Sequence, residues 1–216
     1  MRLQPVIIVM GLISIANAQT PASRDLNLKG GRFKPLTYDQ LTPEQKTMVG
    51  DLAPGQRGGL SGPFNVLLRS PEMGELVQKL GGQLRFHATL PGNLRELAII
   101  ITARYWNAQY EWYTHRGYAI EEGISPATAK AVASGKRPRS PKPEERIVYN
   151  FCTELLNRKT VSDATFQAAI NKFGERTVVE LTALVGFYNL ASLILNVDGY
   201  PLPDGVKPEL GPLREH

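Results

Sequence analysis

The chain has 216 residues and a formal net charge of +5, and 42% of its residues are hydrophobic. A chain of this length and composition normally forms one domain with a sizeable core. Its densest basic stretch, residues 136–142, lies in a proline-rich connector without interleaved aromatic residues. A solvated loop explains this stretch better than a nucleic-acid footprint does, so we expect no nucleic-acid partner.

Residues 1–18 have the pattern of a secretory signal peptide. Arg2 supplies a positive start, residues 6–15 are apolar, and Ala16-Asn17-Ala18 forms a cleavage motif. The apolar run is about half as long as the roughly twenty residues that a transmembrane helix needs. We therefore predict cleavage after Ala18, a periplasmic or secreted protein, and no membrane span in the mature chain.

Residues 19–40 are polar and irregular, and they are predicted to form an N-terminal arm that wraps a neighbouring segment or a subunit. An all-helical domain is predicted over residues 41–198. Its first helix begins at Pro43, because Thr42 and Gln45 form a capping box before it. A glycine-rich connector follows, and Ser70-Pro71 begins a helix that extends to about His87.

Helical patterns also cover much of the second half of the chain. The last of them carries a long apolar run, which indicates a core helix or a subunit interface. A Pro-rich C-terminal tail, residues 199–216, has four prolines and is predicted to be extended and to bury little. The expected helices in this half cover residues 126–135, a stretch from 143, 163–173 and 175–196.

The segment from residue 91 to residue 123 says most about function. Residues 94–106 leave no broad polar face, which is typical of a helix that is buried nearly all round. Glu96 in this helix should therefore be desolvated, and it needs a hydrogen-bonding partner or a proton. Asn107 is a good N-cap residue, so we predict a second helix that starts at Ala108 and packs in the centre of the domain.

Glu111 and His115 are four residues apart on this second helix, so their side chains share a face and can touch. They are also the nearest titratable candidates in sequence to partner Glu96. A purely structural role is an alternative, in which Glu96 bridges His115 or Arg104 within the core.

Four positions in this segment follow the spacing Glu, eleven residues, Cys-x-x-Cys, three residues, His. Glu96 and His115 match its ends, while Ala108 and Glu111 stand where the two cysteines would be. With the flanking sequence, the pattern resembles the thiol hydroperoxidase branch of the carboxymuconolactone decarboxylase and alkylhydroperoxidase D-like (AhpD-like) superfamily. The resemblance spans roughly residues 60–160 and implies an all-α, AhpD-like domain of about seven helices, assembled as a trimer or hexamer.

Both thiols of the motif are missing, and Cys152 is the only cysteine of the chain. Reduction of a hydroperoxide through a dithiol needs two sulfurs within reach, so peroxidase activity is disfavoured. The resemblance instead implies the decarboxylase branch, whose members act on small cyclic acids or lactones without a metal or organic cofactor. We therefore expect a cofactor-independent lyase or hydrolase that acts on a small organic acid or lactone.

In this interpretation His115 is the general base, with Glu96 or Glu111 as acid and orienter. A metal held by these three residues ranks lower, because the sequence supplies no further ligands and no second shell. The alternative is a non-catalytic small-molecule-binding or structural oligomer on the same scaffold. A cavity beside His115 would favour the enzyme, and aromatic packing around it would favour the alternative. The candidate substrate-binding residues are Trp106, Tyr110, Trp112 and His87.

Overall fold

The structure is a computed structural model that describes residues 25–52 and 59–212. Over these residues the chain has eight α-helices and no strand, which confirms the predicted all-α class. The predicted signal peptide, residues 1–18, lies outside the described residues.

The first helices follow the predicted boundaries closely. The backbone N–H of Gln45 donates to Thr42 Oγ1 at 3.3 Å, and the Gln45 side chain accepts from the Thr42 N–H at 2.9 Å. This reciprocal capping starts the first long helix. The elements of this part are η1 (Tyr38–Gln40), α1 (Pro43–Leu52), α2 (Phe64–Leu67), α3 (Pro71–Gly82) and the π-helical turn η2 (Gln83–His87) that continues α3.

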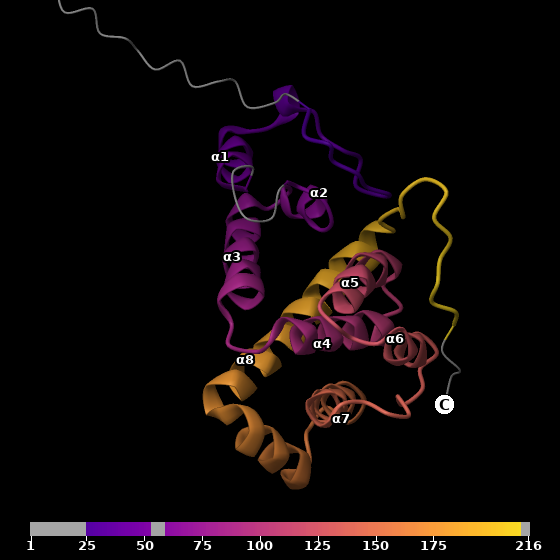
Figure 1. Ribbon diagram of the computed structural model, residues 1–216. Helices are drawn as coiled ribbons and strands as arrows, with labels where there is room; N and C mark the ends of the chain where they lie inside the picture. The colour runs from indigo at the N-terminus through magenta and orange to yellow at the C-terminus, as the bar shows by residue number, and fades with distance from the viewer. Residues whose placement is uncertain (1–24, 53–58, 213–216) are drawn as a thin grey trace, which may run out of the picture.

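Five helices form the rest of the domain, and four of them pack around the fifth (Figure 1). The central helix is α4, which packs against the other four, and not the helix predicted to start at Ala108. The reason is that every residue of α4 from Glu96 to Arg104 is buried, whereas α5 exposes one side of its surface. The five are α4 (Gly92–Tyr105), α5 (Gln109–Glu121), α6 (Pro126–Ala133), α7 (Pro143–Arg158) and α8 (Asp163–Asp198).

The junction between α4 and α5 differs from the prediction by one residue. Asn107 has a φ of 51°, a left-handed conformation that asparagine tolerates, and its Oδ1 accepts from Arg104 Nη1 at 3.0 Å. Asn107 thus ends the first helix and does not cap the second. Ala108 is the N-cap residue, with extended backbone, and α5 begins at Gln109.

α8 contains the two helices that the sequence predicted in this region. Gly174, with a φ of 80° and a ψ of 165°, is non-helical and bends the chain between them. Among the described residues, α8 is the one helix that is long and apolar enough to cross a membrane by length and composition. Half of its most apolar 18-residue window is buried inside the domain, as a core helix requires.

The arm lies against the chain's own C-terminal helix. The Asp198 carboxylate, which is fully buried at the end of α8, accepts the backbone N–H of Phe33 at 2.8 Å and that of Gly31 at 3.2 Å. Asn65 of α2 donates to the Phe33 carbonyl at 2.7 Å. The arm therefore joins the first helices to α8.

The tail is extended, as expected, but it buries more than predicted. It returns from the end of α8 past α5 (Figure 1), and Leu210 is only 4% exposed. The Gln109 side chain brackets Leu210, donating to its carbonyl at 2.7 Å and accepting its N–H at 3.2 Å. Glu209 forms an ion pair with Arg116 at 3.1 Å. Proline content prevented secondary structure here without preventing packing.

Candidate active site

Glu96, Glu111 and His115 meet in the interior between α4 and α5. The His115 Nδ1 lies 2.6 Å from Glu96 Oε2, and its Nε2 lies 3.3 Å from Glu111 Oε2. The first contact joins the two helices, and the second is the predicted contact one turn along α5. The imidazole is thus held at both ring nitrogens by carboxylates.

The three side chains are shielded from solvent. Glu96 is 3% exposed, His115 4% and Glu111 5%. Tyr188 of α8 and Tyr118 of α5 stand edge-on to the imidazole, with ring centroids 5.0 Å and 5.9 Å away. Neither tyrosine was predicted from the sequence, although a tyrosine within the apolar run of the last helix was a usable signal.

Two opposing effects act on the pKa of His115. Burial alone would lower it, because the charged imidazolium loses its hydration. The hydrogen bonds and negative charges of Glu111 and Glu96 outweigh that penalty, so the pKa of His115 is raised. The imidazole therefore keeps its proton to a higher pH than an isolated histidine does.

Glu111 lies in the first turn of α5, where the backbone supplies a favourable environment for an anion. The helix dipole and the unsatisfied N–H groups of a first turn stabilise negative charge, and the N-cap residue, Ala108, has no side-chain acceptor to compete. The motif position that would hold a thiol thus holds a carboxylate in contact with His115.

Ion-pair geometry bears on the metal hypothesis. Each ring nitrogen of His115 faces a different carboxylate, so the two acids sit on separate edges of the imidazole. Within the described ranges, no group of three or more His, Cys, Asp or Glu side chains is arranged to hold a metal ion.

The four candidate substrate-binding residues make other contacts in the structure. Trp106 donates to the Asn189 side chain of α8, and Trp112, buried in the core, donates to Glu209 Oε2 at 3.0 Å. Tyr110 packs edge-on against Tyr200, with centroids 4.4 Å apart. None of these contacts reaches the three acid–base residues.

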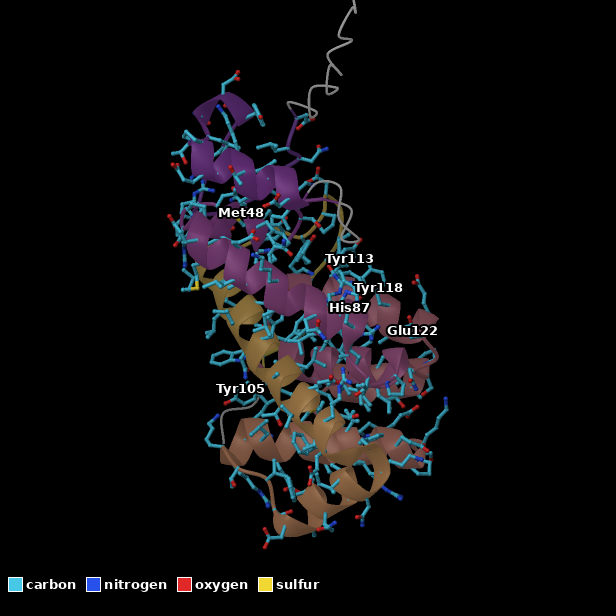
Figure 2. The ribbon with its side chains drawn as sticks, turned by 90° about the vertical axis from the view of Figure 1, so that its left-hand side faces the viewer. Met48, His87, Tyr105, Tyr113, Tyr118 and Glu122 are labelled. Atoms are coloured by element: carbon cyan, nitrogen blue, oxygen red, sulfur yellow. The ribbon has the colours of Figure 1, made fainter. Side chains whose placement is uncertain are left out.

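His87 is exposed at the end of η2, on the same side of the molecule as Tyr118 and Tyr113 in Figure 2. Its neighbour in η2, Arg85, lies over the Tyr118 ring at 5.9 Å. The structure therefore places η2 beside the tyrosine that borders His115, with no direct contact between His87 and the imidazole among the described interactions.

A surface pocket with a volume of about 950 Å³ lies between α4, α6 and α7, and another of about 310 Å³ lies in the arm. Glu96, Glu111 and His115 line neither of these pockets. The burial of all three side chains shows that packing encloses the acid–base group in this conformation.

Cys152, on α7, is fully buried and unpaired. Burial in an apolar environment raises the pKa of its thiol well above the ordinary range, so it is not a reactive thiolate.

Comparison with known structures bears on this arrangement of helices. The crystal structure of an uncharacterized peroxidase-related protein from Ralstonia eutropha JMP134, described as an alkylhydroperoxidase AhpD core, superposes with a TM-score of 0.65. The match covers 80% of this chain and 92% of that one, at 16% sequence identity. The chain has the AhpD-like fold. No protein-family model and no curated protein sequence matches it.

The AhpD-like fold confirms the fold expected from the Glu96 to His115 spacing. In this fold, shared architecture alone assigns no chemistry, because function depends on the side chains of the site. Here those side chains are two carboxylates and one imidazole in a dry interior.

Proposed function

We propose that the chain is an exported, cofactor-independent acid–base enzyme of the carboxymuconolactone decarboxylase type that acts on a small organic acid or lactone. The observation that carries the proposal is the His115 imidazole held at both nitrogens by buried carboxylates. Such a group can donate and accept protons at neutral pH, because neighbouring charges set its proton affinity.

The raised pKa of His115 assigns the roles differently from the sequence-based hypothesis. Because the raised pKa keeps the proton on the imidazole to a higher pH, this proposal gives His115 the role of proton donor, whereas the sequence-based hypothesis gave it the role of base. Glu96, with the shorter contact, orients the ring. Glu111, with the longer contact at 3.3 Å, is the carboxylate that can exchange a proton with substrate or water.

A decarboxylation step balances with these groups. The bond between the substrate carbon and its carboxylate breaks, carbon dioxide leaves, and the electron pair remains on a carbon stabilised by the adjacent carbonyl. His115 then transfers its proton to that carbon. A proton from the bulk solvent then reaches His115 through Glu111 and restores the starting state, so each turnover consumes one proton and releases one carbon dioxide.

Substrate access requires a movement near His115, because the imidazole is 4% exposed. Tyr118 is the side chain that both touches the imidazole ring and reaches solvent, with 43% of its surface exposed. We therefore propose that substrate enters between α5 and η2 when Tyr118 moves. Loop and side-chain gating of this kind is common in enzymes that exclude water.

A non-catalytic binding or structural oligomer is the second candidate, and the enclosure of His115 favours it. In this case the three side chains serve as a buried hydrogen-bonded link between α4 and α5, and ligands bind elsewhere. Homo-oligomer formation is compatible with both candidates. Exposed apolar side chains at helical spacing supply a surface for it, namely Met73, Leu76 and Leu80 on α3, and Leu190, Leu193 and Val197 on α8.

The decisive experiment measures proton transfer directly. The mature protein is incubated in heavy water with a panel of lactones, β-keto acids and lactones that carry a carboxylic acid. NMR then follows deuterium incorporation, carbon dioxide release and ring opening. His115→Ala and Glu111→Gln should each lower the rate about 10²- to 10⁴-fold, a loss typical of general acid–base groups. Circular dichroism of each variant shows whether the fold survives.

Tyr118→Phe provides a control that keeps the ring and removes only the hydroxyl, and it should retain activity if Tyr118 acts as a gate. Full turnover by a folded His115→Ala variant would end the enzyme proposal. Absence of deuterium exchange across the panel, with normal folding, would leave the non-catalytic candidate as the better account.

A further inference from the structure

The pocket of about 950 Å³ is separate from the acid–base group. Its walls come from α4, α6, the turn after α6, α7 and the tail, with Ile101, Val132 and Leu156 as apolar members. Tyr105, another wall residue, lies well apart from Tyr118 and His87 in Figure 2. On α4, Arg104 follows Glu96 by eight residues, or about 12 Å along the axis.

Arg104 is a buried cation in this pocket and has no counter-ion among the residues that the structure describes. It is 6% exposed, and its Nη1 donates to the Gly211 carbonyl at 2.7 Å and to the Asn107 side chain. The guanidinium Nε is buried and has no hydrogen-bond partner. No carboxylate of the described chain pairs with this side chain. A buried charge without a counter-ion is costly even when it is partly hydrogen-bonded, so such a residue is a candidate place for an anion to bind.

Further positive charge surrounds the pocket. Lys136 lines it, and Lys159 binds the hydroxyl of the wall residue Tyr105 at 2.5 Å. Arg137 lies over the ring of the wall residue Tyr149, 5.9 Å from its centroid. None of the twelve lining residues is an aspartate or glutamate. The pocket therefore attracts anions and disfavours cations.

We propose that this pocket binds an organic carboxylate with an apolar body, whose carboxylate group pairs with the Arg104 guanidinium. The side chains of Tyr105, Tyr149 and Leu156 supply the apolar contact surface. Nη1 is occupied by Gly211 and Asn107, so Nε and Nη2 form the remaining edge of the guanidinium, and one such edge suits the two oxygens of a carboxylate in a fork-like pair. The proposal concerns a site distinct from the acid–base group and holds whether or not that group is catalytic.

Calorimetric titration of the mature protein with naphthalene-2-carboxylate tests it, with decanoate as an aliphatic probe. Naphthalene-2-carboxamide, which has the same shape and no charge, should bind at least about tenfold more weakly, because it cannot form a charge-assisted pair. Equal affinity for the acid and the amide would overturn the proposal. A preference for the naphthalene acid over decanoate would identify the ligand body as aromatic, and the reverse as aliphatic.

Variants locate the probe. Arg104→Met should weaken binding of the acid by about tenfold or more while leaving amide binding unchanged. Arg104 also holds Gly211, so its replacement could disturb the tail. Thr153→Phe therefore serves as a second variant, which keeps the charge of Arg104 and fills the pocket. It should abolish binding of the naphthalene acid and of its amide. Lys136→Gln should weaken acid binding by about two- to fivefold. Lys130→Gln, the same charge change on the exposed side of α6, should have no effect.

Other results would refute the site. Loss of binding in His115→Ala, with no loss in Arg104→Met, would place the ligand at the acid–base group. Absence of acid binding, together with a change in oligomeric mass for Thr153→Phe in light scattering, would show that the groove is a subunit interface.

Discussion

Glu96 on α4 and His115 on α5 lie 19 positions apart in sequence, and their side chains meet at 2.6 Å in an interior that excludes solvent. This contact joins the central helix of the domain to the helix that carries Glu111. The ion pair therefore belongs to the packing of the fold as well as to its candidate chemistry, and variants must be read for both effects.

The raised pKa of His115 predicts a specific dependence of stability on pH. Over the range between the unfolded pKa, about 6.5, and the raised folded value, the native protein holds a proton that the unfolded chain has lost. This contribution to the free energy of unfolding is complete below about pH 6.5 and disappears as the pH rises through the folded pKa. Urea denaturation between about pH 5.5 and pH 9 should show the decline in the wild type. The slope should be missing in His115→Gln, and an unchanged slope there would assign it to another group.

Glu96→Gln and Glu111→Gln are predicted to differ in their cost. Loss of the 2.6 Å charged contact should lower the free energy of unfolding by about 1.5–3 kcal/mol. Loss of the 3.3 Å contact should cost less, because the longer contact is weaker.

The double variant should be scarcely worse in turnover than the poorer single one, since residues that act as a unit are non-additive. Stopped-flow kinetics and thermal melts on the same samples separate the two effects.

Restoring the two thiols should convert the chemistry. The double variant Ala108→Cys, Glu111→Cys places a Cys-x-x-Cys pair at the N-terminus of α5, where a thiol pKa is lowered. We expect thiol-dependent reduction of an organic hydroperoxide by this variant and none by the wild type. Cys152→Ser should change neither result, because that thiol is buried. Peroxide turnover by the wild type that vanishes in Cys152→Ser would contradict the assignment.

Gly31→Ala should destabilise the protein by detaching the arm. A Cβ at Gly31 would lie 2.4 Å from the Gly199 carbonyl oxygen and 2.5 Å from that of Asp198, so the backbone must shift. A cost of about 1–3 kcal/mol in chemical denaturation is expected for such overpacking. Gly50→Ala is the matched control, because a Cβ there meets no atom within 4 Å, and it should be neutral or stabilising. Equal effects of the two changes would contradict the conclusion that the contacts of the arm with Asp198, here called the clamp, stabilise the protein.

Export predicts a defined N-terminus. The mature protein recovered from a periplasmic or culture fraction should begin at Gln19, because the Ala16-Asn17-Ala18 motif directs cleavage after Ala18. Amino-terminal sequencing decides this. An intact Met1 in that fraction would rule out the cleavage, and recovery only from the cytoplasmic fraction would rule out export.

The sequence predicted the helices and the Glu111–His115 contact because both depend on local spacing, whereas the Glu96–His115 contact between α4 and α5 was expected from the apolar surroundings of Glu96 and from the family resemblance. The apolar length of α4 and the four-residue step on α5 are read directly from residue order. The features that the sequence did not predict depend on tertiary contacts between segments that are distant in the chain. Tyr188 reaches His115 from α8, and Arg104 donates to the Gly211 carbonyl in the tail, so neither contact has a local signature. Asn107 misled because the same residue type favours both ends of a helix.

The contacts of the arm with Asp198 have a consequence for the order of folding. They join residues 165 to 167 positions apart, whereas α4 and α5 are neighbours in the chain. The entropy of closing so long a loop is lost before its contacts form, so the helix pair should assemble first. During synthesis the arm is made before the eight helices, and its partner carboxylate at the end of α8 is made after them. The clamp can therefore close only after nearly the whole domain has been made, which makes it a late step of folding rather than a nucleus.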